Sequence, residues 1–332
     1  MAMDGEDSGT CSLGLGCRLE ISLFSFLGEL VPCLLVGVWI GRRHPQFSGR
    51  VAQPLVRFGV PISVMGLLLR GGITSDMVVA AVIAAVAISL TLLISAGVPC
   101  LRRWLGGPCG WMGSCVGNTA YFGVPAALAL LPPEALPISI GYDLGATLLV
   151  WSLGPLVIGG IDRQRESGLL QRLWRGLSSS PVLPGLIGAL MVQLTPWREG
   201  VALILWWPSR LVILLALAVV GMRLGTLVAG RGTTSAKLPP LGTLLPALVG
   251  KLLLYPLLLL LIGLWLGLDS VVVQAITLQG AAPTAISILL IAESVRCHQA
   301  FAAGLVLWST MFALLVSPAW GYLLQKIFIA AA

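Results

Sequence analysis

Leu252-Leu-Leu-Tyr-Pro-Leu-Leu-Leu-Leu-Leu-Ile262 is an apolar run in which polar and apolar residues do not alternate. A membrane-spanning strand would alternate them over about ten residues, so this run predicts a helix within lipid. The whole chain agrees, since 57% of its 332 residues are hydrophobic, 10% are charged, and the mean hydropathy is +0.98. Soluble domains are about 25% charged. The sequence therefore predicts an all-α integral membrane protein.

Segments of this kind recur, and a helix needs about 20 residues to cross the hydrocarbon core. Ten are predicted, at residues 20–41, 51–70, 77–99, 111–131, 136–160, 181–197, 201–222, 242–266, 270–293 and 299–325. Thirteen of the 20 basic residues lie in the loops after the odd-numbered spans, and four lie on the opposite side. Because cytoplasmic loops are enriched in Lys and Arg, both termini are predicted outside the cytoplasm, and the plasma (inner) membrane is the expected location.

The chain divides at residues 161–180, a central loop that carries four arginines and is predicted to be cytoplasmic. Residues 1–19 are polar and Gly-rich and are predicted to form an N-terminal tail. Five spans lie in residues 20–160 and five in residues 181–325. Since each half has an odd number of spans, the two halves enter the membrane from opposite sides, as inverted repeats do.

Two spans carry polar residues, glycine and proline at mid-depth: Gly117-Asn-Thr-Ala-Tyr-Phe-Gly-Val-Pro125 and Thr277-Leu-Gln-Gly-Ala-Ala-Pro-Thr284. Each proline is followed by a Trp-Ser pair, Trp151-Ser152 after 26 residues and Trp308-Ser309 after 25. Proline interrupts helical hydrogen bonding, and freed backbone groups survive in the membrane only where they line a cavity or are buried in protein. Paired breaks in inverted halves point to a transport site, and the helix N-termini after them favour an anion. The alternative is that both prolines merely kink packed helices.

Several function classes are excluded. No Walker-type nucleotide motif is present, and no acid/base or metal-ligating groups gather as an enzyme needs, so no cofactor and no metal is expected. The net charge of +7 resides mostly in arginines between apolar runs rather than on a soluble face, so nucleic acid is not an expected partner. Seven cysteines show no metal-binding spacing.

Asn118-Thr-Ala-Tyr-Phe-Gly-Val-Pro125 resembles the fourth-span signature of the auxin efflux carrier family. This family includes the plant PIN proteins, the PIN-likes and bacterial malonate/malate permeases, within the bile-acid/arsenite/riboflavin-type transporter superfamily. The Lys251–Pro256 segment is similar to the family's Lys-plus-Pro segment in span 8. Span 9, with Gly280 and Pro283 followed by Glu293, also fits, and the resemblance covers roughly residues 20–325.

The resemblance implies ten transmembrane helices in two inverted five-helix repeats, with broken helices 4 and 9 crossing near Pro125 and Pro283. Spans 3–5 and 8–10 would form a transport domain. Spans 1, 2, 6 and 7 would form a scaffold, through which two copies often dimerise.

Candidate site residues fall into three sets. The substrate-binding candidates offer hydroxyl or amide groups beside the breaks: Asn118, Thr119, Tyr121, Gln279 and Thr284. The candidates for the break and crossing are Gly117, Gly123, Pro125, Gly280 and Pro283. The ionisable candidates for coupling or charge balance are Asp143, Lys251 and Glu29. Each ionisable group also has a structural alternative. Asp143 can remain hydrated near the outer interface, and Glu29 can have a structural role. Lys251 can hydrogen-bond to backbone carbonyls at the crossing, or extend its ammonium group towards the cytoplasmic interface.

These patterns predict a secondary transporter of a small organic anion that works by alternating access, and the resemblance implies a carboxylate similar to auxin or malonate. The anion and the lipid bilayer are the expected partners, with a homodimer through the scaffold. Two alternatives remain: a sodium-coupled symporter of the bile-acid type, and a non-transporting membrane sensor.

Overall fold

The computed structural model describes residues 28, 30–160, 171, 174, 178, 180, 182–229 and 238–329. Within these residues the regular elements are helices, and the one β feature is an isolated bridge. A helix at residues 30–43 comes first. In chain order there follow α2 (Pro45–Pro54), η1 (Leu55–Gly59), α3 (Val60–Gly71), α4 (Ser75–Gly97), α5 (Pro99–Trp104), α6 (Pro108–Cys115), η2 (Thr119–Gly123), α7 (Val124–Leu130), α8 (Ala135–Gly159), α10 (Val182–Gln193), α11 (Arg198–Val228), α12 (Leu241–Val249), η4 (Gly250–Leu254), α13 (Tyr255–Trp265), α14 (Ser270–Gly280), α15 (Ile286–Ser294) and α16 (Gln299–Ile329), where η marks a π-helix.

Six helices in the described part of the chain are long and apolar enough to cross a membrane. They are Pro45–Gly71, Ser75–Gly97, Ala135–Gly159, Arg198–Thr226, Leu241–Trp265 and Gln299–Phe328. The prediction of an all-helical chain with membrane-spanning helices is therefore confirmed for the described residues. The segments predicted as spans 4 and 9 are each divided into two shorter helices, and α10 has only 12 residues. Ten spans in two inverted halves remain a prediction.

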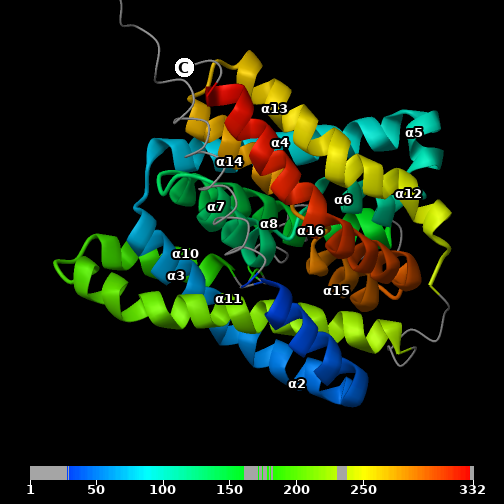
Figure 1. The fold of residues 1–332 in the computed structure, drawn as a ribbon, viewed down its shortest axis with the longest axis horizontal. Coiled ribbons are helices and arrows are strands. Elements are labelled where there is room, and N and C mark those ends of the chain that lie inside the picture. The colour runs from blue at the N-terminus through cyan, green and yellow to red at the C-terminus, as the bar shows by residue number, and fades with distance from the viewer. Residues whose placement is uncertain are drawn as a thin grey trace, which may run out of the picture.

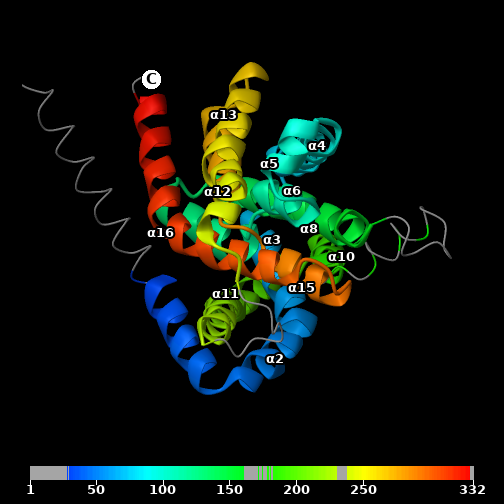
Figure 2. The same cartoon turned by 90° about the vertical axis from the view of Figure 1, so that its right-hand side faces the viewer.

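The helices form two groups. The helix of residues 30–43 packs against α11, which also contacts α2, α3 and α10, and we call this set the α3–α11 group. Helices α4–α8 and α12–α16 make up the other set, which we call the crossing group. Figures 1 and 2 both show α2, α3 and α11 together on one side of the molecule, with α4, α12, α13 and α16 on the other.

Small residues let the helices within the α3–α11 group approach closely. Gly37 and Gly41 on the first helix face Gly221 and Gly225 on α11, and an added Cβ at any of them would lie 2.0–2.3 Å from a carbonyl oxygen of the facing helix. In lipid, helix association depends on van der Waals packing and close backbone approach, for which glycines four residues apart are well suited. These contacts fix the first helix on α11.

Three π-helical turns precede prolines. Pro61, Pro125 and Pro256 each follow such a turn by two residues, after η1, η2 and η4 respectively. A proline removes an N–H donor and crowds the carbonyl four residues earlier, and a wider π turn relieves that crowding while the helix continues. Behind Pro256, the freed carbonyl of Leu252 accepts a hydrogen bond from the Trp320 indole N–H at 2.9 Å.

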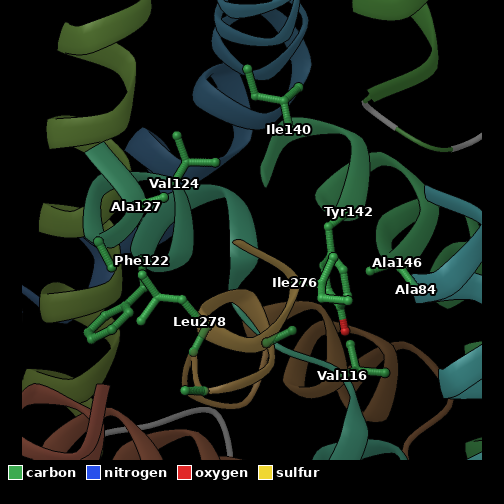
Figure 3. Packing of buried hydrophobic residues seen from close by; sticks show 14 of the residues in the cluster. Ala84, Val116, Phe122, Val124, Ala127, Ile140, Tyr142, Ala146, Ile276 and Leu278 are labelled. Atoms are coloured by element: carbon green, nitrogen blue, oxygen red, sulfur yellow. The ribbon is translucent and has the colours of Figure 1, made fainter. Parts of the chain in front are cut away.

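The largest cluster of buried apolar residues extends over both helix groups, and one part of it lies where the divided helices meet α8. Phe122 and Val124 from the first divided helix gather with Ile276 and Leu278 from the second and with Tyr142 from α8 (Figure 3). All five are at most 2% exposed. This packing holds the two interruptions in the middle of the crossing group.

Candidate functional site

The first interruption consists of Val116, Gly117 and Asn118. Helix α6 stops at Cys115, and η2 begins at Thr119. Val116 is extended, with φ −88° and ψ 118°, and Asn118 precedes η2 with φ −77° and ψ 65°. Glycine and asparagine are weak helix formers, and asparagine favours the position just before a helix, so this pair marks the break locally.

The second interruption runs from Ala281 to Ala285. Helix α14 ends at Gly280 and α15 begins at Ile286. Pro283 lies in the middle, where it supplies no N–H and disfavours helical geometry in the residue before it. Ala285 is extended, with φ −64° and ψ 139°, and starts α15.

The two interruptions are joined by backbone hydrogen bonds. Gly117 and Thr284 form an isolated antiparallel bridge. The Asn118 N–H donates to the Pro283 carbonyl at 2.7 Å, and the Ala285 N–H donates to the Val116 carbonyl at 3.1 Å. Four backbone groups that would otherwise be costly in lipid are therefore satisfied where the breaks meet.

The expectation of a break near Pro125 is wrong. Pro125 lies at the start of α7, within one helical stretch from Thr119 to Leu130, and the break lies seven residues earlier, at Asn118. The physical reason is that proline is compatible with the first turn of a helix, where its missing N–H would have no intrahelical partner. At Pro283, by contrast, the chain is not helical.

Side chains satisfy further groups at the interruptions. The Thr284 hydroxyl donates to the Gly113 carbonyl at 2.9 Å, and the Thr284 N–H donates to the Ser309 hydroxyl at 3.0 Å. The Ser317 hydroxyl donates to the Ala281 carbonyl at 2.8 Å. The crossing is therefore held by hydroxyl groups from α16 as well as by its own backbone.

A cavity of about 120 Å³ opens beside this crossing, room for several waters or a small ligand. Its polar wall comes from the crossing group and includes Asn118, Thr119, Tyr121, Asp143, Thr147 and Ser287. Its other wall comes from the α3–α11 group and is apolar apart from Ser63: Val56, Val60, Ser63, Val64, Leu67, Val182 and Ile213. The cavity therefore lies between the two helix groups.

Comparison with known families finds one match, to the family described as membrane transport protein, over residues 164–321. The matched region carries the second interruption. The matched family is that of the auxin efflux carriers and their PIN-like relatives. Residues 164–321 are therefore similar to the members of this membrane transport family. The match confirms the resemblance over those residues, and the chain is a transmembrane transport protein. A search of curated proteins gave no match.

In this transport protein, Asp143 connects the first interruption to α8. Its carboxylate accepts hydrogen bonds from the Thr119 hydroxyl at 2.5 Å and the Thr147 hydroxyl at 3.4 Å, and the Ala120 N–H lies close enough to stabilise its charge. Asp143 is 5% exposed and lines the cavity. A carboxylate at the first N–H groups of a helix is stabilised by charge-assisted hydrogen bonds and by the helix dipole. Asp143 thus occupies the start of η2 as a bound anion would.

The predicted substrate-binding residues divide into two sets. Asn118, Thr119 and Tyr121 line the cavity, whereas Gln279 and Thr284 do not. Gln279 is fully buried, and its amide lies against Gly123 with no hydrogen-bond partner among the described residues. Sequence spacing could not show this, because it does not tell which face of a helix meets the cavity.

The predicted ionisable residues also divide. The ammonium of Lys251 is fully buried and donates a hydrogen bond to the Gly280 carbonyl at the end of α14. It lies 5.0 Å from the ring centre of Tyr255, whose hydroxyl is 2.9 Å from that of Tyr142. Lys251 is not part of the cavity lining, and Glu29 lies outside the described residues.

The remaining predicted break residues provide close packing. Gly117 lies close to Lys251, since an added Cβ would be 3.2 Å from Nζ, and an added Cβ at Gly280 would be 2.5 Å from Leu259. Only small residues fit where the divided helices approach other chain segments this closely.

Sequence reasoning missed several residues of the site. Thr147 lies one helical turn after Asp143, which is a local signal, and Ser309 belongs to the repeated Trp-Ser pair. No comparable signal marks Ser317. An ion pair, Arg223–Glu293 at 3.5 Å, links α11 to α15 and thus the two helix groups.

Proposed function

We propose that the protein is a secondary carrier of a small organic anion, a carboxylate similar in kind to auxin or malonate. The observation that carries this proposal is the cavity, which lies where two interrupted helices meet and between two helix groups. Interrupted helices in oppositely inserted halves are how many carriers build a binding site within the membrane. We further propose ten spans in two inverted repeats, with both termini outside the cytoplasm.

In this proposal the substrate carboxylate binds at the start of α15. Ala285, Ile286 and Ser287 line the cavity there, and the first N–H groups of a helix attract an anion. The start of η2 is already occupied by the Asp143 carboxylate, whereas the hydroxyl of Ser309 near the start of α15 is neutral. The amide of Asn118 would donate a hydrogen bond to the same carboxylate.

Access would alternate by movement of the crossing group against the α3–α11 group. The polar residues of the cavity belong to the crossing group, and the opposite wall is almost entirely apolar, so a bound anion would keep its polar contacts during such a movement. The α3–α11 group would then be the scaffold, and it is the surface through which we expect two copies to dimerise.

The test is uptake by the purified protein in proteoliposomes. Radiolabelled malonate, malate and an aromatic carboxylate are the probes, and empty liposomes give the background. We expect uptake of at least one probe by the wild type, and at least a tenfold loss in Asn118→Ala. The matched control is Thr91→Ala, because the Thr91 hydroxyl bonds the carbonyl of Ala87 in its own helix and does not line the cavity.

The same vesicles separate the carrier from its two rivals. Binding of a probe without any flux would identify a sensor. Uptake that requires sodium, tested by replacing it with potassium, would identify a sodium-coupled symporter. Uptake by Asn118→Ala at the wild-type rate would show that the proposed site is wrong.

A further inference from the structure

Asp143 gives the cavity a negative charge with no opposing cation in its lining. The described residues that line the cavity include one carboxyl group and no lysine, arginine or histidine. Lys251, the other buried ionisable residue at the crossing, is hydrogen-bonded to Gly280 instead. The carboxylate of a substrate in the same small cavity would lie beside the negative charge of Asp143. Repulsion between like charges is strong in a medium of low polarity.

The residues around Asp143 do not neutralise its charge. Helix α8 is in close contact with α7, α10 and α14, none of which has an acidic, basic, tyrosine or cysteine side chain. Tyr121 is the titratable residue of η2, and it lines the same cavity as Asp143. The other groups on helices around α8 are Arg70 and Asp76, which are exposed, Glu293, which pairs with Arg223, and the buried thiols Cys109 and Cys115.

We propose that Asp143 binds one proton for each anion carried, so that the protein is a proton–anion symporter. This inference rests on the proposed function. The proton comes from water on the side from which the anion arrives, binds a carboxyl oxygen of Asp143, and returns to water when the anion leaves on the opposite side. No covalent bond other than this O–H bond forms or breaks.

The charge carried by the crossing group favours a proton with each anion. In the empty carrier the ionised Asp143 keeps its hydrogen bonds from the Thr119 and Thr147 hydroxyls. Malonate is a dianion near neutral pH, so the loaded cavity holds two negative charges when Asp143 is protonated and would hold three without the proton. Protonation of Asp143 therefore lowers by one the charge that must cross the membrane with the anion. Binding linkage then requires that protonation and anion affinity increase each other equally.

The experiment uses the full chain in proteoliposomes with malonate as the probe. Accumulation is measured with and without a pH gradient of one unit, acidic on the outside, at clamped membrane potential. For the wild type we expect the gradient to raise accumulation about tenfold, since one coupled proton is worth a factor of ten per pH unit. Asp143→Asn keeps the size and a hydrogen-bonding group but cannot bind a proton there. We expect it to transport malonate with no response to the gradient.

Two variants complete the design. Asp143→Glu restores a titratable carboxyl group and is expected to restore the response, and Asp76→Asn removes an exposed carboxylate as the matched control. If Asp143→Asn transports malonate and still responds tenfold to the gradient, the proton binds elsewhere and the inference is overturned. If Asp143→Asn does not fold, proton uptake on malonate binding to the purified wild type decides: about one proton per site supports the inference, and none overturns it. Absence of flux for every carboxylate probe would instead overturn the proposed function, and the inference with it.

Discussion

The contact between Gly123 and Gln279 gives the sharpest test of how the divided helices pack. In Gly123→Ala, the added Cβ would lie 2.0 Å from Oε1, 2.9 Å from Cδ and 3.2 Å from Nε2 of Gln279. These are its three nearest neighbouring atoms, so the clash involves a single side chain. Ordinary contact begins near 3.4 Å, so the amide would have to move by about 1.4 Å. Gln279 is fully buried, and no free space at the surface is open to it.

The magnitude follows from this geometry. Overpacking of a buried site costs about 1–3 kcal/mol, which we expect for Gly123→Ala. Gln279→Ala leaves a void but also removes an amide without hydrogen-bond partners, and these effects oppose each other, so we expect a loss below about 2 kcal/mol. In the double variant the added methyl group fills part of the void. We expect a favourable coupling energy of about 2 kcal/mol between the two substitutions.

The assay is a double-mutant cycle on thermal unfolding of the purified protein in detergent, with malonate uptake measured in parallel. Gly123→Ala is expected to unfold several degrees below the wild type, and the double variant to recover most of that loss. Gly200→Ala is the control, because an added Cβ there meets nothing within 4 Å. Additive effects of the two substitutions would refute the described contact.

Three further predictions concern the groups that hold the fold. Thr284→Val should lower the free energy of unfolding by about 1–3 kcal/mol because it leaves the Gly113 carbonyl unsatisfied, whereas Thr284→Ser keeps the hydroxyl and should not. The free energy of unfolding is measured by denaturation, and an equal decrease in both variants would count against this hydrogen bond. Gly221→Ala places a Cβ 2.3 Å from a backbone oxygen of the facing helix, so thermal unfolding should shift downward by more than in Gly123→Ala, and an unchanged midpoint would contradict the close helix contact. The partly exposed Arg223–Glu293 pair should contribute no more than about 1 kcal/mol in a double-mutant cycle, and a larger coupling would mean that the pair is better shielded than described.

Long apolar helices were the most predictable feature of the fold. The predicted span 136–160 is observed as Ala135–Gly159, and 242–266 is observed as Leu241–Trp265. Length and apolarity define such segments without knowledge of their neighbours. The position of the first break was harder to predict, because Pro125 suits the first turn of a helix as well as it suits a break. The weaker Gly117-Asn118 signal was the one that marked it.

The cavity was predictable only in part. The sequence places Asn118, Thr119 and Tyr121 beside a break, and these residues line the cavity. Gln279 also lies beside a break in the sequence but packs against Gly123, since the rotation of α14 decides which side chains face the cavity. The hydroxyl of Ser317 reaches the Ala281 carbonyl across 36 residues of sequence, and no local pattern specifies a contact of that kind.

The difference between the two halves matters more to the proposed mechanism than their similarity. Near each interruption, the last long helix of the same half supplies a polar side chain that accepts a hydrogen bond from the interrupted segment. In the first half Asp143 accepts it from the Thr119 hydroxyl, and in the second half Ser309 accepts it from the Thr284 N–H. Two acidic residues would fill both helix N-termini with fixed charge and exclude an anion. Two neutral residues would bind an anion but would offer no group to take up a proton. With one of each, the start of α15 remains open to a carboxylate, and the start of η2 holds a carboxyl group whose charge can respond to it.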